Sequence, residues 1–245
     1  RRAHRPLYLM NPSFHFKQFT INQDQCAMKV GTDGVLLGAW VDLAASPESI
    51  LDIGSGTGLI ALQLAQRSQA SIIDGVEIDP QAHAQCVENF ENSLWNDRLF
   101  CYHVSIQEFT QELLEPYDLI VANPPYFAHA PNTDLSRDRA RNKAHLSFES
   151  LISCSAQLLA PEGLFAIIIP APEANSFIAL AQKHQLFLRR TCQVKGQPSS
   201  ATKRCLLEFS FAQNTPVETS LVIENSRHNY TDQYIALVSE FYLKM

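Results

Sequence analysis

The stretch that decides the fold is Asp52-Ile53-Gly54-Ser55-Gly56-Thr57-Gly58. It follows a short apolar run that starts at Ile50 and precedes a helix-compatible segment that opens at Leu59. Glycines at alternating positions let the backbone turn sharply and approach a ligand without side-chain obstruction, at the carboxyl end of a parallel strand. An ordinary tight turn would also use glycine. The G-x-G-x-G spacing, with an acid two residues before its first glycine, favours a ligand-binding loop instead.

Glu77 has the position expected for a residue that holds a ribose. It ends the apolar run Ile72 to Glu77, the next strand expected after the glycine-rich loop. An ionised carboxylate accepts two hydrogen bonds, so one side chain here can hold both hydroxyls of a ribose. An exposed acid at a strand end is the alternative interpretation, and the glycines upstream weigh against it.

From Ile50 onwards, short apolar runs alternate with amphipathic stretches, which is typical of a mainly parallel sheet covered on both faces. The pattern predicts seven strands, at residues 50–53, 72–77, 99–104, 119–122, 165–169, 186–194 and 204–211, and helices at residues 59–67, 80–91, 106–114, 148–159, 173–184 and 232–241. Only a short segment with Gly196 and Pro198 separates strands six and seven, which predicts an antiparallel hairpin at one sheet edge. The predicted fold is therefore α/β, with a seven-stranded Rossmann-like sheet and helices on both faces.

Composition limits the possible classes of protein. A chain of 245 residues, 46% hydrophobic and 18% charged, suits a single structural domain, in which we expect residues 1–45 to be an N-terminal extension packed on the ligand side of residues 46–245. The net charge of −6 argues against non-specific coating of nucleic acid. Six cysteines without a C-x-x-C pair predict reduced core thiols, a cytoplasmic location and no bound metal. No apolar run reaches the roughly 18 residues of a membrane span, so we expect no membrane association.

The predicted strand at residues 119–122 runs directly into Asn123-Pro124-Pro125-Tyr126. Two consecutive prolines remove two backbone N–H donors and hold the segment extended, so it offers hydrogen-bond acceptors without competing donors. The Asn123 side-chain oxygen and the Pro124 carbonyl can accept both hydrogens of a planar amino group and direct its lone pair. Tyr126 provides a flat face on which an extruded base can stack. A proline-rich strand exit with no catalytic role is the alternative.

Together, the glycine-rich loop, Glu77 and the Asn-Pro-Pro-Tyr motif resemble the seven-stranded class I S-adenosylmethionine-dependent methyltransferases. The resemblance implies S-adenosyl-L-methionine as cofactor and Asn123, Pro124, Pro125 and Tyr126 as catalytic residues. It also implies that the cofactor is bound by Asp52, Gly54, Gly56, Gly58, Glu77, Ser105, Ile106 and Asn123. Ser105 and Ile106 would flank the adenine. Many relatives have Asp in place of Ser105, and a neutral hydroxyl is a weaker acceptor than a carboxylate.

A second, closer resemblance rests mainly on the run Lys29-Val30-Gly31-Thr32-Asp33-Gly34-Val35-Leu36-Leu37-Gly38-Ala39-Trp40. Taken alone, this run is helix-compatible, with Thr32 and Asp33 as helix caps or cofactor contacts. With Ser93-Leu94-Trp95 and the tail Phe241 to Met245, it is similar over nearly the whole chain to the tRNA1(Val) (adenine(37)-N6)-methyltransferase family. The resemblance implies methylation of N6 of adenine 37 in tRNA1(Val), with Thr32 and Asp33 closing over the methionine end of the cofactor.

Enzymes that methylate other nitrogen acceptors share the Asn-Pro-Pro-Tyr motif. These acceptors are guanine N2, as in an rRNA methyltransferase, and a protein glutamine amide. Protein glutamine N5-methyltransferases of this kind usually carry a separate N-terminal helical domain, and the roughly 45 residues before strand one are too few for a typical one. The intact motif disfavours a non-catalytic cofactor-binding or RNA-binding module. We expect no obligate protein partner.

Basic residues gather in two segments near the expected entrance of the base. The loop after Phe127 and the hairpin of strands six and seven provide Arg137, Arg139, Arg141, Lys143, Lys203 and Arg204, with His145 and Lys195 beside them. Guanidinium and ammonium groups suit phosphates, so the first six residues are predicted to bind a tRNA anticodon stem-loop. Asp134 and Asp138 are interleaved with the basic residues of the loop, so a solvated loop is the equally weighted alternative.

Overall fold

The structure is a computed structural model that describes residues 13–26, 28–112, 115–125 and 146–245. The strands are β1 (Ser13–His15), β2 (Thr20–Asn22), β3 (Ser49–Ile53), β4 (Ile72–Glu77), β5 (Leu99–His103), β6 (Tyr117–Ala122), β7 (Leu159–Pro170), β8 (Phe187–Lys195), β9 (Thr202–Ser210), β10 (Val217–Val222), β11 (Glu224–Ser226) and β12 (Asn229–Tyr230). The helices are α1 (Thr32–Trp40), α2 (Leu59–Arg67), α3 (Pro80–Glu91), α4 (Ile106–Glu112), α6 (Phe148–Leu158), the 3-10 turn η1 (Ala171–Glu173), α7 (Ala174–Lys183) and α8 (Asp232–Val238).

Within the described residues, the main sheet has eight strands in the order β10-β8-β9-β7-β6-β3-β4-β5. Strands β3 to β7 are parallel to one another, and β9 pairs antiparallel with both β7 and β8. The antiparallel hairpin predicted for strands six and seven is therefore confirmed as β8 and β9. The predicted strand count of seven was too low, and the hairpin does not form the sheet edge, because β10 pairs parallel with β8 outside it.

The missed strand β10 has little apolar signal. Its first four residues are exposed, and Leu221 is its one buried side chain. Backbone hydrogen bonds at the edge of a sheet hold such a strand, whereas sequence prediction depends on alternating apolar side chains that face a core.

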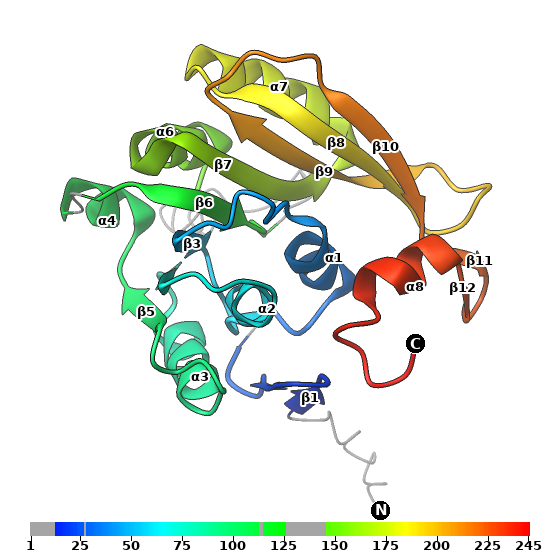
Figure 1. Ribbon diagram of the computed structural model, residues 1–245, viewed down its shortest axis with the longest axis horizontal. Coiled ribbons are helices and arrows are strands. Elements are labelled where there is room, and N and C mark those ends of the chain that lie inside the picture. Colours follow the sequence, from blue (N-terminus) through cyan, green and yellow to red (C-terminus); the bar gives the residue numbers. More distant parts are fainter. Residues whose placement is uncertain (1–12, 27, 113–114, 126–145) are drawn as a thin grey trace, which may run out of the picture.

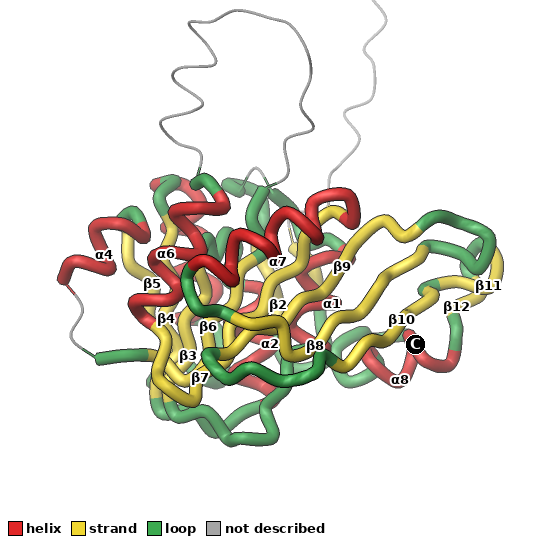
Figure 2. Tube along the Cα trace, turned by 90° about the horizontal axis from the view of Figure 1, so that it is seen from above, coloured by secondary structure: helices red, strands yellow, loops and turns green. Residues whose placement is uncertain are grey.

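Helices cover both faces of the sheet, as predicted (Figure 1). One core packs α1, α2, α3 and α8 on the first face, and the other packs α4, α6 and α7 on the second. Alternation along β9 places Leu206 in the first core and Leu207 in the second, which is the two-residue period of a strand buried on both sides. Seen from above, α4, α6 and α7 lie in a row across the sheet (Figure 2).

Local signals predicted two helices residue for residue. Both α2 and α3 have the expected bounds, and the Asp79 side chain caps α3 by accepting hydrogen bonds from the amides of Gln81 and Ala82. In α1 the expectation of Thr32 and Asp33 as caps was wrong. Gly31 occupies the N-cap position in extended conformation without a side-chain cap, and Thr32 is the first helical residue.

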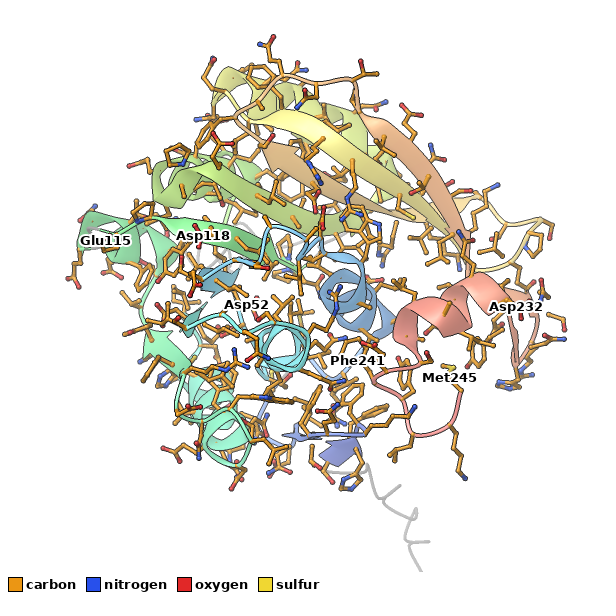
Figure 3. All side chains as sticks on the ribbon, viewed as in Figure 1. Asp52, Glu115, Asp118, Asp232, Phe241 and Met245 are labelled. Atoms are coloured by element: carbon orange, nitrogen blue, oxygen red, sulfur yellow. The ribbon has the colours of Figure 1, made fainter. Side chains whose placement is uncertain are left out.

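The two ends of the described chain pack together on the first face. Phe16 forms an antiparallel bridge with Tyr242, and the Lys17 amide donates a hydrogen bond of 2.8 Å to the carbonyl of Phe241. The Phe241 side chain is buried at the start of the C-terminal tail (Figure 3). The β1–β2 hairpin is thereby fixed to the hydrophobic core that also contains α1 and α2. The hairpin adds the buried side chain of Ile21 to this core.

All six cysteines are free thiols, and five of them are buried, in agreement with the prediction of reduced core thiols. Among the described residues, none of the helices is both long and apolar enough to cross a membrane.

Candidate active site

The glycine-rich loop joins β3 to α2 at the carboxyl end of the parallel strands. Gly54, Gly56 and Gly58 have φ angles of 73°, 55° and 80°, a left-handed conformation that residues with a side chain rarely adopt. A Cβ atom added at Gly54 would meet no atom within 4 Å, whereas one at Gly58 would lie 2.5 Å from the ring of Phe90. The loop therefore packs tightly against α3 at one end and leaves open space at the other.

Glu77 connects this loop to the next turn. Its carboxylate accepts hydrogen bonds of 2.9 Å from the amides of Gly56 and Asp79, one on each oxygen, and the residue is 9% exposed. A carboxylate oxygen has two acceptor positions, so each oxygen keeps one for a ligand. The next residue, Ile78, is 52% exposed at the end of β4. Ile78 was not among the residues singled out in the sequence, although an apolar side chain directly after Glu77 marks the position.

Asp52 is a buried carboxylate in the interior of the molecule (Figure 3). It is 1% exposed, and neither of its oxygens has a hydrogen-bond partner of ordinary geometry among the described residues. Burial raises the pKa of Asp52 to about 7, an effect that the nearby Ala61 amide opposes and the Glu77 carboxylate reinforces. A buried polar group without a partner is costly, so this carboxyl is suited to a ligand cation.

Asn123 follows β6 beside the glycine-rich loop. Ile53 of β3 pairs in register with Ala122 of β6, so the loop and the Asn-Pro-Pro segment leave the sheet from adjacent positions. Asn123 is half-buried, Pro124 is buried and Pro125 is exposed. Tyr126 lies outside the described residues.

The N-terminal turn of α1 reaches the same place. A Cβ atom at Gly34 would lie 3.7 Å from the Asn123 side-chain nitrogen and 3.0 Å from the Leu59 side chain. A side chain at position 34 would therefore press on Leu59 at the start of α2, and its Cβ atom would already be in van der Waals contact with Asn123. The close approach explains a glycine inside this helix, where it otherwise costs about 1 kcal/mol relative to alanine.

Asp33 and Arg204, predicted separately for cofactor and RNA, bind each other. The Arg204 Nε donates a hydrogen bond of 2.7 Å to the Asp33 carboxylate, which ties the first turn of α1 to β9. Both side chains are partly exposed, at 33% and 27%. Thr32 and Lys203 are exposed.

Ser105 forms a reciprocal capping box at the start of α4. Its hydroxyl donates a hydrogen bond of 2.6 Å to the Glu108 carboxylate and accepts one of 3.2 Å from the Glu108 amide. The Ser105 hydroxyl and amide lower the pKa of the Glu108 carboxyl. The Ser105 hydroxyl thus donates its proton to Glu108, within the chain. The adjacent Ile106 is buried. The predicted RNA-binding residues Arg137, Arg139, Arg141 and Lys143 lie outside the described residues.

Comparison with known proteins identifies the family. The model of the methyltransferase small domain matches residues 34–178. A tRNA1(Val) (adenine(37)-N6)-methyltransferase of Flavobacterium psychrophilum is 52% identical, with 95% of this chain and 100% of that protein covered. The protein of the same name from Christiangramia forsetii is 49% identical over 97% of this chain and 100% of its own length. The chain belongs to the tRNA1(Val) (adenine(37)-N6)-methyltransferase family.

Solved structures agree with the fold of the family. A predicted O-methyltransferase from Agrobacterium tumefaciens superposes with a TM-score of 0.65 at 16% identity, and the match covers 85% of this chain and 96% of that one. The predicted class I methyltransferase fold is therefore confirmed, and the edge strand β10 is the one strand of the main sheet beyond the seven predicted.

Proposed function

We propose that this methyltransferase transfers the methyl group of S-adenosyl-L-methionine to N6 of adenine 37 in tRNA1(Val). The proposal is carried by one observation: the Asn-Pro-Pro segment leaves β6 directly beside the glycine-rich loop that leaves β3. A group held by the segment and a cofactor held by the loop would then be neighbours. The names of the relatives at 52% and 49% identity support the choice of tRNA and of adenine N6.

The residues of the site fit S-adenosyl-L-methionine. The buried carboxyl of Asp52, which has only the nearby Ala61 amide beside it and no hydrogen bond of ordinary geometry among the described residues, suits the methionine ammonium. Gly54 leaves room for the methionine backbone. The free acceptor positions of Glu77 suit the ribose hydroxyls, and the exposed Ile78 suits one face of the adenine. When bound, the cofactor supplies an electrophilic methyl group on a sulfonium.

The remaining cofactor residues have supporting tasks in this proposal. Gly56 and Gly58 keep the loop in its left-handed shape, and Ile106 lies beside the adenine region. Thr32 and Asp33 lie in the first turn of α1, which approaches Asn123 through Gly34 and would cover the methionine end. Because the Ser105 hydroxyl is already hydrogen-bonded to Glu108 in the capping box, we propose that Ser105 holds the start of α4 beside the adenine.

The residues after β6 position the adenine amino group for the reaction. The Asn123 side-chain oxygen and the Pro124 carbonyl accept the two hydrogens of the adenine amino group, which directs the nitrogen lone pair toward the methyl group. The amino group needs no strong general base, since it can release a proton after it has been methylated. Pro125 adds no donor that would compete, and Tyr126 stacks on the extruded base.

We also assign the phosphates of the anticodon stem-loop to Arg137, Arg139, Arg141, Lys143 and Lys203. Their positive charges would offset the net charge of −6 locally, at the place where the base enters. Arg204 differs from them, because its guanidinium already bonds Asp33.

Incubation with labelled cofactor and separate pools of tRNA, rRNA and protein tests the substrate. We expect label only in tRNA, as N6-methyladenosine identified by mass spectrometry of nucleosides. Label in rRNA as N2-methylguanosine would favour the guanine-N2 alternative, and label in protein would favour the glutamine N5 alternative.

Asn123→Ala tests the chemistry in the same system. The variant loses one of two acceptors that matter most in the transition state, so the single-turnover rate should fall about a hundredfold or more, further than the affinity for the cofactor. Asn92→Ala, at the exposed C-cap of α3, is the matched control and should keep the wild-type rate. A wild-type rate in Asn123→Ala would refute the amino-group mechanism.

A further inference from the structure

A polar segment of the N-terminal extension is held against α3 and the glycine-rich loop. We call residues 22–26 and 28–30 the strap, because they connect β2 to the N-cap of α1. The side chains that hold the strap lie on one face of α3, where Gln85 and Asn89 are buried and Glu88 is half-buried, and their spacing is that of neighbours on a helix. Such a seat fixes where the strap runs.

Asn89 makes the central contact. It is 2% exposed, and its side-chain oxygen accepts a hydrogen bond of 2.8 Å from the amide of Asn22. Its side-chain nitrogen donates to the carbonyl of Asn22 at 3.0 Å and to the carbonyl of Thr57 at 2.8 Å. One buried amide therefore binds the strap like a neighbouring strand and also holds the glycine-rich loop. Leaving these buried groups unpaired would be costly, so the contact specifies one geometry.

Gln85 makes the second contact, one helical turn earlier. It is fully buried, its oxygen accepts a hydrogen bond of 2.9 Å from the amide of Gln25, and its nitrogen donates to Glu88 at 2.8 Å. Glu88 in turn accepts a hydrogen bond of 3.0 Å from the side chain of Asn22. The strap is thus bound to α3 at two backbone amides, one backbone carbonyl and one side chain.

The strap is held by the same two elements that bond Glu77. Asn89 joins the strap to Thr57, the residue after Gly56, and α3 begins at the Asp79 cap, whose amide bonds Glu77 as the Gly56 amide does. Cys26 is 7% exposed, and its pKa is raised first by burial and then by the carboxylates of Glu77 and Asp79, against the effect of the Met28 amide. Further along, the buried side chain of Gln23 accepts a hydrogen bond of 2.9 Å from the amide of Val30, just before α1 begins. The strap therefore runs from the glycine-rich loop to the helix that approaches Asn123.

We propose that the strap is the outer wall of the ribose side of the cofactor site, and that Asn89 and Gln85 are positioning residues that set cofactor affinity through it. This inference rests on the proposed function, since it assumes that Glu77 holds the ribose of S-adenosyl-L-methionine. Asn89 acts on two sides of the ligand together, because it orients the Thr57 carbonyl of the loop and the backbone of the strap. The side chain itself need not touch the cofactor.

Asn89→Asp and Asn89→Leu test the central contact by calorimetric titration with S-adenosylhomocysteine, at a temperature where each variant is fully folded. Asp keeps the acceptor for Asn22 but loses both donors, and Leu loses all three bonds. We expect the dissociation constant to rise about tenfold in both, equal to about 1.4 kcal/mol. The KM for S-adenosyl-L-methionine should rise in parallel, while kcat at saturating cofactor and tRNA stays within about threefold. Asn92→Leu, at the C-cap of the same helix, is the control and should leave the dissociation constant, KM and kcat unchanged.

Gln25→Pro tests the strap without altering α3. Proline removes the Gln25 amide that bonds Gln85, and it also replaces the side chain and restricts φ at this position. Gln25→Ala is the matched control, because it loses the same side chain but keeps the amide. We expect weaker binding in Gln25→Pro and wild-type binding in Gln25→Ala, so this pair decides the matter if the Asn89 variants do not fold.

Failure of the two proposals looks different in these titrations. If the wild-type protein binds no S-adenosylhomocysteine, the proposed function is wrong. If the wild type binds it, and folded Asn89→Leu and Gln25→Pro bind equally well, the positioning role is wrong. A fall in kcat with unchanged affinity would also overturn it.

Discussion

Replacing Asp52 by asparagine should stabilise the protein at high pH and not at low pH. The folded-state pKa of about 7 lies above the ordinary 3.8, so the folded chain holds this proton where the unfolded chain has lost it. The resulting cost to stability is absent below pH 3.8, grows as the pH rises, and is complete above pH 7. A shift of about 3 pKa units corresponds to about 4 kcal/mol. Between pH 5 and pH 9 the cost should grow by about 3 kcal/mol.

The assay is urea unfolding of the wild type and Asp52→Asn from pH 5 to pH 9. At any one pH, the difference in unfolding free energy between the two proteins includes a constant cost of burying the asparagine amide. This constant cancels when the differences at two pH values are compared, so the change with pH comes from the Asp52 carboxyl alone. Asp42→Asn is the control. The Ala44 amide lowers the pKa of Asp42, and Arg189 adds to this, so its stabilising effect is already complete at pH 5 and should stay constant to pH 9. The reasoning is refuted if the difference for Asp52→Asn is the same at pH 5 and pH 9.

Two further pairs of substitutions test the loop and the link between α1 and β9. Gly58→Ala should destabilise the fold more than Gly54→Ala, because both have left-handed φ angles but only the first meets the Phe90 ring; equal losses in urea unfolding would contradict this packing. Asp33→Asn and Arg204→Ala should be coupled in a double-mutant cycle on unfolding free energy, by at most about 1 kcal/mol because both groups are partly exposed. Additive effects would mean that the pair contributes nothing.

Much of the fold follows from local signals. The short apolar run from Ile50, the alternating glycines of the loop and the Asp79–Pro80 start predict β3, α2 and α3 closely, since each signal depends on neighbours along the chain. The same holds for the glycine-rich loop, Glu77 and Asn123, which lie at the carboxyl ends of the parallel strands β3, β4 and β6. Their convergence at one edge of the sheet is a consequence of parallel strand direction.

The tertiary structure decided the contacts between distant segments. Asn22 bonds Asn89 across 67 positions, and Asp33 bonds Arg204 across 171, so no local pattern marks either pair. Sequence reasoning assigned Asp33 and Arg204 to different ligands because it takes each charge with its chain neighbours, whereas packing of α1 against β9 brings the two charges together. Residue types and periodicity determine which elements form. Which buried polar groups satisfy one another is determined only when those elements pack, because a buried hydrogen bond depends on distance in space.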